Sequence, residues 1–210
     1  MSHFDYRAPI SRDIGMALAR QLDQNVARNF VLAARASATV SGGDGGSQLT
    51  NANYATNADT LVQGAFDAAT QLDSKYVPEN DRFLFVKPQQ YNLLVNSTSK
   101  LINRDYGNEG NGSTADGVVL RVAGFEIVKT NNLPTADDSS NSNIPTAYQG
   151  NYSTTIGIAA QKEAVGTVKL IDVAVEAGWE RMFQGWLLVG KYAVGHGILR
   201  PECAVELKTA

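Results

Sequence analysis

The chain has 210 residues, a formal net charge of −3 at pH 7 and 43% hydrophobic residues. These values are typical of a globular protein, and they exclude a disordered polyelectrolyte and a polybasic reader of nucleic acid. The single cysteine, Cys203, excludes an internal disulfide and a metal site built from several thiolates. No apolar stretch of about 18 residues is present, and the N-terminus lacks the apolar core of a signal peptide. We therefore expect no membrane span and a protein made in the cytoplasm.

The first predicted element is a long amphipathic helix over residues 11–36. Ser11 can cap its start, and apolar residues recur every four positions at Ile14, Leu18, Leu22, Val26 and Phe30. A helix of this extent would be about 39 Å long at ~1.5 Å per residue. Helices of globular proteins average nearer ~11–12 residues, so the length indicates a strut that lies across a sheet.

A glycine-rich segment, residues 41–47, follows this helix. It does not match a phosphate-binding loop, because no strand precedes it and no Lys-Ser or Lys-Thr pair follows. We predict a flexible linker or hinge here. Residues 48–57 are expected to continue this polar connection.

The middle of the chain alternates between helical and extended patterns. The expected elements are a helix over 58–75 capped by Asn57, a strand over 83–86, a helix opening at Pro88, and two strands, 118–122 and 125–130, that flank Gly124. Two polar segments, 96–116 and 131–153, are expected to be loops. Because loops longer than ~12–15 residues are uncommon in compact domains, we expect the second to be a mobile tip at a subunit junction.

The last third of the chain has the composition of β structure. Strands are predicted over 155–160, from 167 to about 175, over 185–195 and over 204–207, because β-branched and aromatic residues dominate there. The chain therefore begins in helix and ends in sheet. This order predicts an α+β protein in which the two ends share a domain and the middle is an insertion.

Residues that could carry chemistry are sparse. His3 and His196 are the histidines of the chain, and a Cys203–His196 pair would suggest a thiol hydrolase. No nucleophile motif surrounds Cys203, so a structural histidine and a buried thiol are favoured. The acidic pair Asp137 and Asp138 lies in the polar loop and is interpreted as solvated. We predict no catalytic, cofactor-binding or metal-binding residues.

Two segments resemble a known family. Residues 1–9 (MSHFDYRAP) lead into the long helix, and residues 164–170 (AVGTVKL) and 191–202 (KYAVGHGILRPE) bracket the C-terminal strands. Both regions are similar to the major capsid protein of T7-like podoviruses, which has the HK97 fold. Members of that family carry an N-terminal arm and an extended loop before the long helix, whereas nine residues precede it here. We expect either a shortened chain or contacts supplied by other chains.

The resemblance implies an HK97-like α+β fold with a spine helix, a peripheral β-sheet domain and an inserted axial domain. Residues 1–56 would form the peripheral domain with the spine helix and hinge. Residues 57–165 would form the axial domain, and residues 166–210 would return to the peripheral domain as its long sheet.

The resemblance also implies a non-enzymatic capsid subunit that assembles as hexamers and pentamers around phage double-stranded DNA. Its expected partners are copies of itself, scaffolding and portal proteins, and DNA that it contacts non-specifically. No cofactor is expected, and the protein would be assembled in the bacterial cytoplasm and reside in the virion. The residues expected at subunit interfaces are Arg12, Arg20, Gln24 and Arg28 on the polar face of the helix, and Lys169, Glu180, Arg181, Lys191, Arg200 and Glu202 on the peripheral sheet. The alternatives are an encapsulin-like compartment shell protein and the Cys–His hydrolase.

Overall fold

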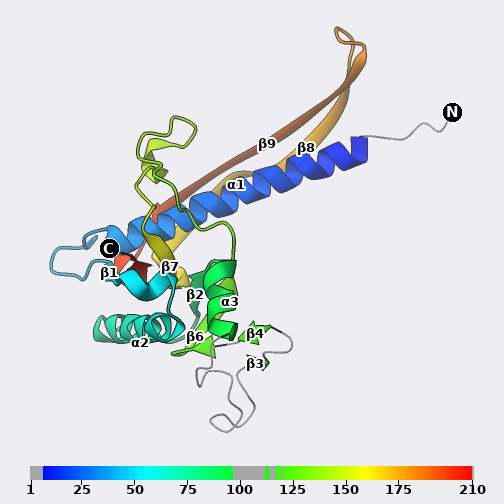
Figure 1. The fold of residues 1–210 in the computed structure, drawn as a ribbon. Helices are drawn as coiled ribbons and strands as arrows, with labels where there is room; N and C mark the ends of the chain where they lie inside the picture. Colours follow the sequence, from blue (N-terminus) through cyan, green and yellow to red (C-terminus); the bar gives the residue numbers. More distant parts are fainter. Residues whose placement is uncertain (1–6, 97–111, 114–116, 120, 210) are drawn as a thin grey trace.

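The structure is a computed structural model that describes residues 7–96, 112–113, 117–119 and 121–209. It has two parts, a body built on a mixed β-sheet and an arm that projects from the body (Figure 1). One long helix belongs to both parts. In the described ranges, no helix combines the length and the apolar character needed to span a bilayer.

The long helix is α1, Arg7–Arg35, with 29 residues. The predicted strut is confirmed, although it begins four residues earlier than residue 11. The earlier start is compatible with Pro9, because the amide groups of a first helical turn have no partner within the helix. At ~1.5 Å per residue, α1 is about 44 Å long.

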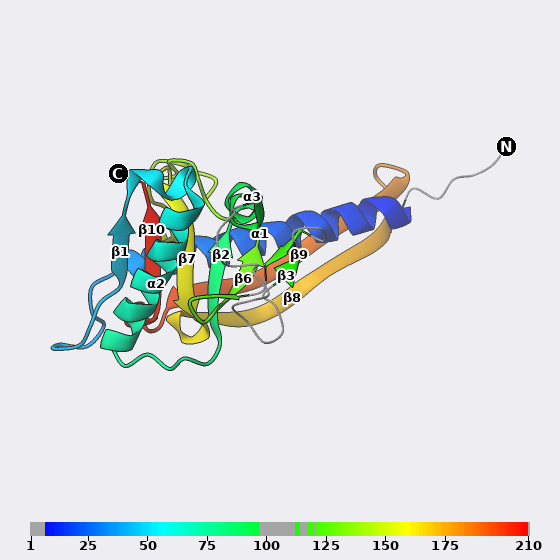
Figure 2. The same cartoon turned by 60° about the horizontal axis from the view of Figure 1, so that its bottom comes forward.

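The arm consists of the N-terminal half of α1 and a long antiparallel ribbon. The ribbon is formed by β8, Val165–Glu180, and β9, Gly185–Ile198. Figures 1 and 2 show both strands running beside α1 and extending with it beyond the body. The ambiguous pattern around residues 185–195 is therefore a strand, as predicted.

The body contains a six-stranded sheet with the order β1-β10-β7-β2-β6-β5. The strands are β1 Ser47–Thr50, β10 Ala204–Lys208, β7 Thr155–Gln161, β2 Arg82–Val86, β6 Phe125–Lys129 and β5 Arg121–Val122. The pairs β1–β10 and β2–β6 are parallel, and the other pairs are antiparallel. A separate two-stranded sheet joins β3, Gly112–Ser113, to β4, Val118–Val119.

Helices cover both faces of the large sheet. The helix α2, Ala58–Ser74, lies on one face and α1 lies on the other, with α3, Pro88–Asn96, beside β2 and β6 (Figure 2). Asn57 caps α2 as predicted, since its side-chain oxygen accepts from the backbone N–H of Asp59 at 2.9 Å. The buried core lies between these layers and includes Leu61, Leu72, Leu84, Ile158 and Leu207. Short 3-10 helices occupy Ala52–Ala55, Thr146–Tyr148, Lys162–Ala164 and Pro201–Cys203.

Residues 41–57 differ from the prediction. The expected polar connection over 48–57 contains β1 and a 3-10 helix, because β1 finds a parallel partner in β10, which is distant in sequence. The glycine-rich turn also packs tightly on the end of α1. Gly46 donates its N–H to the carbonyl of Ala36 at 2.9 Å, and a Cβ at Gly46 would lie 2.3 Å from the carbonyl oxygen of Ala33. Gly46 is therefore required for the close approach of this turn to α1.

The strands predicted on either side of Gly124 are present, and β5 and β6 form a hairpin. Ala123 and Gly124 form its turn with φ values of 50° and 82°, as in a type I′ turn. Most of the expected loop over 96–116 lies outside the described residues. The first and last strands of the body along the chain, β1 and β10, fall in the segments assigned to the peripheral domain. They nevertheless belong to the same sheet as β7 and β2.

Candidate functional site

The outer face of the arm carries exposed apolar side chains. Gly190 of β9 faces α1, since a Cβ there would lie 2.4 Å from Cγ2 of Ile14. Side chains alternate between the two faces of a strand, so Leu187 and Val189 point away from α1. Both are exposed, as is Val168 of β8, whose side chain is 77% exposed opposite Gly195. We call this surface, Val168, Ile171, Leu187 and Val189, the outer face.

The tip of the arm is also apolar and exposed. Met182 and Phe183 lie in the turn between β8 and β9, and both are more than 80% exposed. Trp179 and Trp186 face each other across the strands just behind the tip, with ring centroids 6.0 Å apart and an edge-to-face angle of 81°. The Arg7 guanidinium lies 4.5 Å from the Trp186 ring centroid, which ties the start of α1 to the tip.

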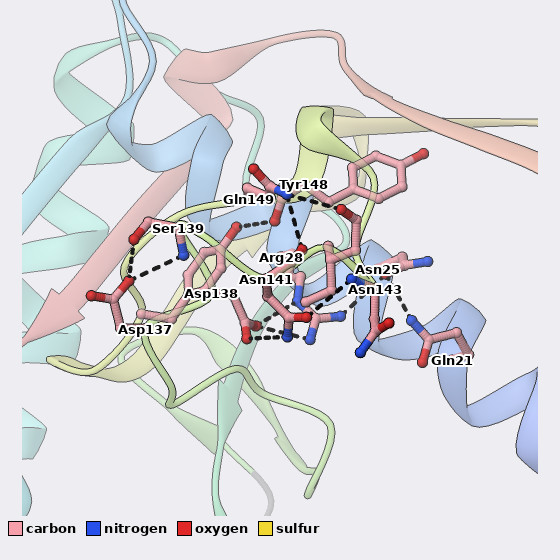
Figure 3. A network of polar contacts seen from close by, with 12 residues as sticks. Gln21, Asn25, Arg28, Asp137, Asp138, Ser139, Asn141, Asn143, Tyr148 and Gln149 are labelled. Atoms are coloured by element: carbon pink, nitrogen blue, oxygen red, sulfur yellow. Dashed lines mark hydrogen bonds and ion pairs between the residues drawn. The ribbon is translucent and has the colours of Figure 1, made fainter.

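A buried ion pair holds the polar segment 131–153 against α1 (Figure 3). Arg28 donates from Nε and Nη2 to Oδ2 of Asp138 at 3.2 and 3.0 Å, and from Nη1 to Oδ1 of Asn25 at 3.1 Å. The Asp138 side chain also accepts from Nδ2 of Asn141 at 3.2 Å. The prediction that both carboxylates of this segment are solvated is wrong for Asp138, because Asp138 is buried. It is confirmed for Asp137, which is exposed.

A second ion pair joins α1 to the sheet. Arg35 donates from Nη2 and Nε to the two carboxylate oxygens of Glu206 at 2.6 and 2.7 Å, and Glu206 is fully buried. The Thr155 hydroxyl donates to the same carboxylate at 2.7 Å. Hydrogen bonding to Glu206 raises the pKa of Arg35 above its ordinary value, despite partial burial. This arrangement anchors the last turn of α1 to β7 and β10.

A protein-family model described as "Gp10A-like: Major capsid protein" matches residues 1–208 of the chain. The chain belongs to this family. It is 27% identical over 230 residues to the major capsid protein of Enterobacteria phage T3, an alignment that covers 97% of this chain and 65% of that protein. The chain therefore spans about two-thirds of the length of this capsid relative.

Solved capsid structures have the same fold. A capsid chain of the cyanophage P-SCSP1u is 38% identical, with a TM-score of 0.90, and the match covers 100% of this chain and 68% of that one. A chain of the mature capsid of bacteriophage PhiM1 is 21% identical, with a TM-score of 0.83 and coverage of 100% and 66%, and this likeness concerns the fold alone. The HK97-like α+β fold expected from the sequence is confirmed.

The residues predicted at capsid subunit interfaces fall into different environments. Those that are exposed on α1 or the arm are Arg12, Arg20, Lys169, Arg181 and Lys191, while Gln24 and Glu180 are half-buried. Lys169 pairs with Asp172 at 3.4 Å, and Lys191 pairs with Glu176, both on the exposed ribbon. The prediction that Arg28 lies on the exposed polar face of α1 is wrong, because Arg28 is buried in an ion pair with Asp138.

Arg200 and Glu202 hold the corner at the base of the arm. Arg200 donates from Nε to Glu202 at 2.8 Å and from Nη1 to Glu163 at 2.7 Å. These hydrogen bonds to carboxylates raise the pKa of Arg200. The pair therefore stabilises the turn between β9 and β10, and it remains partly exposed.

The geometry does not support a thiol hydrolase. Cys203 is fully buried, and this burial raises the pKa of its thiol, whereas a nucleophilic cysteine requires a lowered pKa. His196 lies on β9, where its Nδ1 is 3.0 Å from the Thr167 hydroxyl, and partial burial lowers its pKa. Among the described residues, no three side chains of the metal-binding types converge on one point.

Sequence reasoning missed two features, the exposed outer face of the ribbon and the burial of Asp138 against α1. The outer face could have been found, because Trp186 and Leu188 are apolar on one face of the strand while Leu187 and Val189 are apolar on the other. A ribbon of two strands that is apolar on both faces needs a cover on each side. Asp138 had no such signal, since its partner Arg28 is 110 residues away in the chain.

Proposed function

We propose that this chain is a structural subunit of a phage head, the major capsid protein of an icosahedral shell that encloses double-stranded DNA. Membership of the capsid family supports this proposal. The observation that carries it is the projecting arm, which exposes large apolar side chains at its tip and on its outer face, on both sides of the Lys191–Glu176 ion pair. Exposed apolar side chains gathered on one element mark a surface that contacts another protein. A neighbouring subunit that covers Val168, Leu187 and Val189 would remove that surface from water.

The proposed contacts follow from the shape of the arm. The charges Arg12, Arg20, Lys169, Arg181 and Lys191 are exposed on α1 and the ribbon, and they would select the partner and its register. Gln24, Glu180, Arg200 and Glu202 would contribute at the edges. Such contacts are heterologous and close around five-fold and six-fold axes, so we propose pentamers and hexamers.

We also propose the domain division expected from the family. Residues 1–56 and 166–210 would form the peripheral domain, and residues 57–165 the axial domain. The strands β1 and β10 would then be contributed by the peripheral segments to the sheet of the axial part.

The proposed partners beyond the chain itself are scaffolding and portal proteins, and DNA contacted non-specifically. A net charge of −3 suits a shell that encloses DNA better than a protein that binds a specific DNA sequence. The protein would be assembled in the bacterial cytoplasm and reside in the virion.

The alternatives have less support. An encapsulin-like compartment shell would share the fold, but the family model and the 38% identical cyanophage chain both favour a phage capsid. The hydrolase alternative lacks a usable nucleophile, since Cys203 is buried.

The test compares two exposed valines. Val168 lies on the outer face, and Val40, which is 71% exposed, lies in the turn after α1 at the far end of the body. We expect the wild-type chain to form closed shells or five- and six-membered rings in native light scattering and negative-stain microscopy. Val168→Lys should prevent this assembly by placing a charge in an apolar contact, and Val40→Lys should leave it unchanged.

Two outcomes would contradict the proposal. A wild-type chain that stays monomeric at high concentration, even with a scaffolding protein present, would argue against a shell subunit. Equal assembly of wild type and Val168→Lys would show that the outer face is not a subunit contact. Circular dichroism of each variant establishes that the fold is retained.

A further inference from the structure

The polar segment 131–153, which we call the strap, connects β6 to β7 by way of α1. Figure 1 shows it leaving β6, rising past α1 on the side away from α2 and α3, and returning to β7. A connecting segment of this length, in which Thr146–Tyr148 is a single short 3-10 helix, is uncommon unless it has a function. Its contacts show what it holds together.

The strap is closed on itself by backbone hydrogen bonds. The N–H of Asp138 donates to the carbonyl of Gly150 at 3.0 Å, and the N–H of Tyr152 donates to the carbonyl of Ala136 at 3.0 Å. Inside the loop that these two bonds close, Nε2 of Gln149 donates to the carbonyl of Ile144 at 3.1 Å. The strap is thus a compact loop whose two ends lie close together. Contacts on one side of it can therefore restrain elements that are bound on its other side.

One side of the strap is bonded to α1 at successive levels. Asp138 binds Arg28, and the carbonyl of Asn151 accepts from Nη1 of Arg35 at 2.6 Å. Arg28 and Arg35 are seven residues apart, so they lie on the same face of the helix. The Arg28–Asp138 pair has side chains only 11% and 10% exposed, so salt screens it much less than a surface pair.

The other side of the strap is bonded to the base of the arm. The backbone N–H of His196 in β9 donates to Oη of Tyr148 at 2.9 Å, and the two rings are 6.0 Å apart. Tyr148 is held in turn by Tyr152, whose hydroxyl donates to the Tyr148 carbonyl at 2.7 Å. Tyr152 is fully buried, and this burial raises its pKa to about 12, so its hydroxyl stays protonated as a donor.

We infer that the strap fixes the angle between the arm and the body, with the Arg28–Asp138 pair as its anchor on α1 and Tyr148 as its anchor on β9. A long helix such as α1 can bend along its length. A brace bonded to the helix at Arg28 and Arg35 and to the ribbon at His196 restrains that bending. For a shell subunit, the arm angle in each copy sets the curvature of the assembly, and this consequence rests on the proposed function.

The restraint can be measured in the unassembled chain. Trp179 and Trp186 are the two tryptophans of the sequence, and both lie near the arm tip, so their time-resolved fluorescence anisotropy reports arm motion. Asp138→Asn weakens the anchor on α1, and Tyr148→Phe removes only the hydroxyl that binds β9. Asp137→Asn is the matched control, since Asp137 is an exposed neighbouring carboxylate that makes no bond to α1 or β9.

We expect a larger amplitude of nanosecond arm motion in Asp138→Asn and Tyr148→Phe, and no change in Asp137→Asn. Hydrogen exchange should separate the two anchors. Loss of a buried charged hydrogen bond should accelerate exchange of the Asp138 and Tyr152 amides about tenfold or more in Asp138→Asn. In Tyr148→Phe, the accelerated amide should be that of His196.

An unchanged anisotropy decay in Tyr148→Phe, with a native circular dichroism spectrum, would overturn the inference. The same conclusion would follow if Asp138→Asn exchanged faster in the strap while the arm stayed as rigid as in the wild type. If Asp138→Asn does not fold, Tyr148→Phe decides the question, because it removes a single oxygen.

A second readout uses assembly. If the wild-type chain forms closed shells, Tyr148→Phe should give open or irregularly curved products, and uniform shells of wild-type diameter would contradict a role in curvature. If the wild-type chain does not assemble, the proposed function fails while the anisotropy measurement still tests the strap.

Discussion

Glu206 illustrates how a charge is accommodated in the interior of this protein. Its carboxylate is fully buried between α1 and the sheet, where it accepts hydrogen bonds from Arg35 and from the Thr155 hydroxyl. A buried carboxylate without such partners would be strongly disfavoured. The bidentate guanidinium supplies both charge and geometry. Arg28 and Asp138 form a second ion pair two turns earlier on α1, in which two N–H groups of Arg28 donate to the same oxygen, Oδ2 of Asp138.

Removing one member of the Glu206 pair should therefore be costly. We expect Glu206→Ala to lower the free energy of unfolding by about 3 kcal/mol, because it leaves the partly buried Arg35 guanidinium without its carboxylate partner. Glu176→Ala is the control, since Glu176 pairs with Lys191 on the exposed ribbon, and its loss should change stability by less than about 1 kcal/mol. Urea denaturation of both variants measures the difference. Equal destabilisation would show that the Arg35–Glu206 pair contributes no more than a surface pair.

At the scale of elements, the contact between α1 and β9 depends on a missing side chain. A Cβ at Gly190 would lie 2.4 Å from Cγ2 of Ile14 and 2.9 Å from Cδ1 of Leu18. Glycine at this position allows the helix to lie directly on the strand. Gly195 lies on the same strand with nothing within 4 Å of its Cβ position, so it has no such constraint.

This difference predicts that substitution by alanine lowers the stability of the chain at Gly190 but not at Gly195. Gly190→Ala should destabilise the chain by about 1–3 kcal/mol through overpacking against α1. Gly195→Ala should be within about 0.5 kcal/mol of wild type, as is usual for surface substitutions. Thermal unfolding followed by circular dichroism compares them. If Gly190→Ala proves as stable as Gly195→Ala, the helix and strand are not in close contact in solution.

At the scale of the whole molecule, the body and the arm are stabilised to different degrees. Among the described residues, the buried apolar cluster lies in the body and reaches the ribbon only at its base, through the partly buried Val165 and Ile198. The outer half of the ribbon packs on α1 along one face and leaves the other exposed. Local stability follows buried apolar contact, so the arm is the less stable part of the isolated chain.

We expect backbone amides of β8 and β9 beyond residue 170 to exchange with solvent at least about tenfold faster than those of β7 and β10 in the unassembled chain. Assembly should slow the exchange of the arm, because the outer face would then be covered. Hydrogen exchange with mass spectrometry before and after assembly measures both. Protection of the arm equal to that of the body in the unassembled chain would contradict this prediction.

Local patterns in the sequence determined most of the elements. The four-residue apolar spacing predicted α1, Asn57 marked the start of α2, and Gly124 separated the two predicted strands, because each of these features depends on residues close together in the chain. The family resemblance of the two end segments added the fold and the function class. Both came from the sequence by itself.

Only the tertiary structure decided the remaining contacts. The parallel pairing of β1 with β10 joins strands about 160 residues apart, and Arg28 meets Asp138 across 110 residues. A local pattern carries no signal for such partners, so the sequence predicts neither the pairing of β1 nor the burial of Asp138. The exposure of the outer face is of the same kind. Apolar residues on both faces of a ribbon predict two covers, but only the folded chain shows that α1 supplies one and that the other face is exposed.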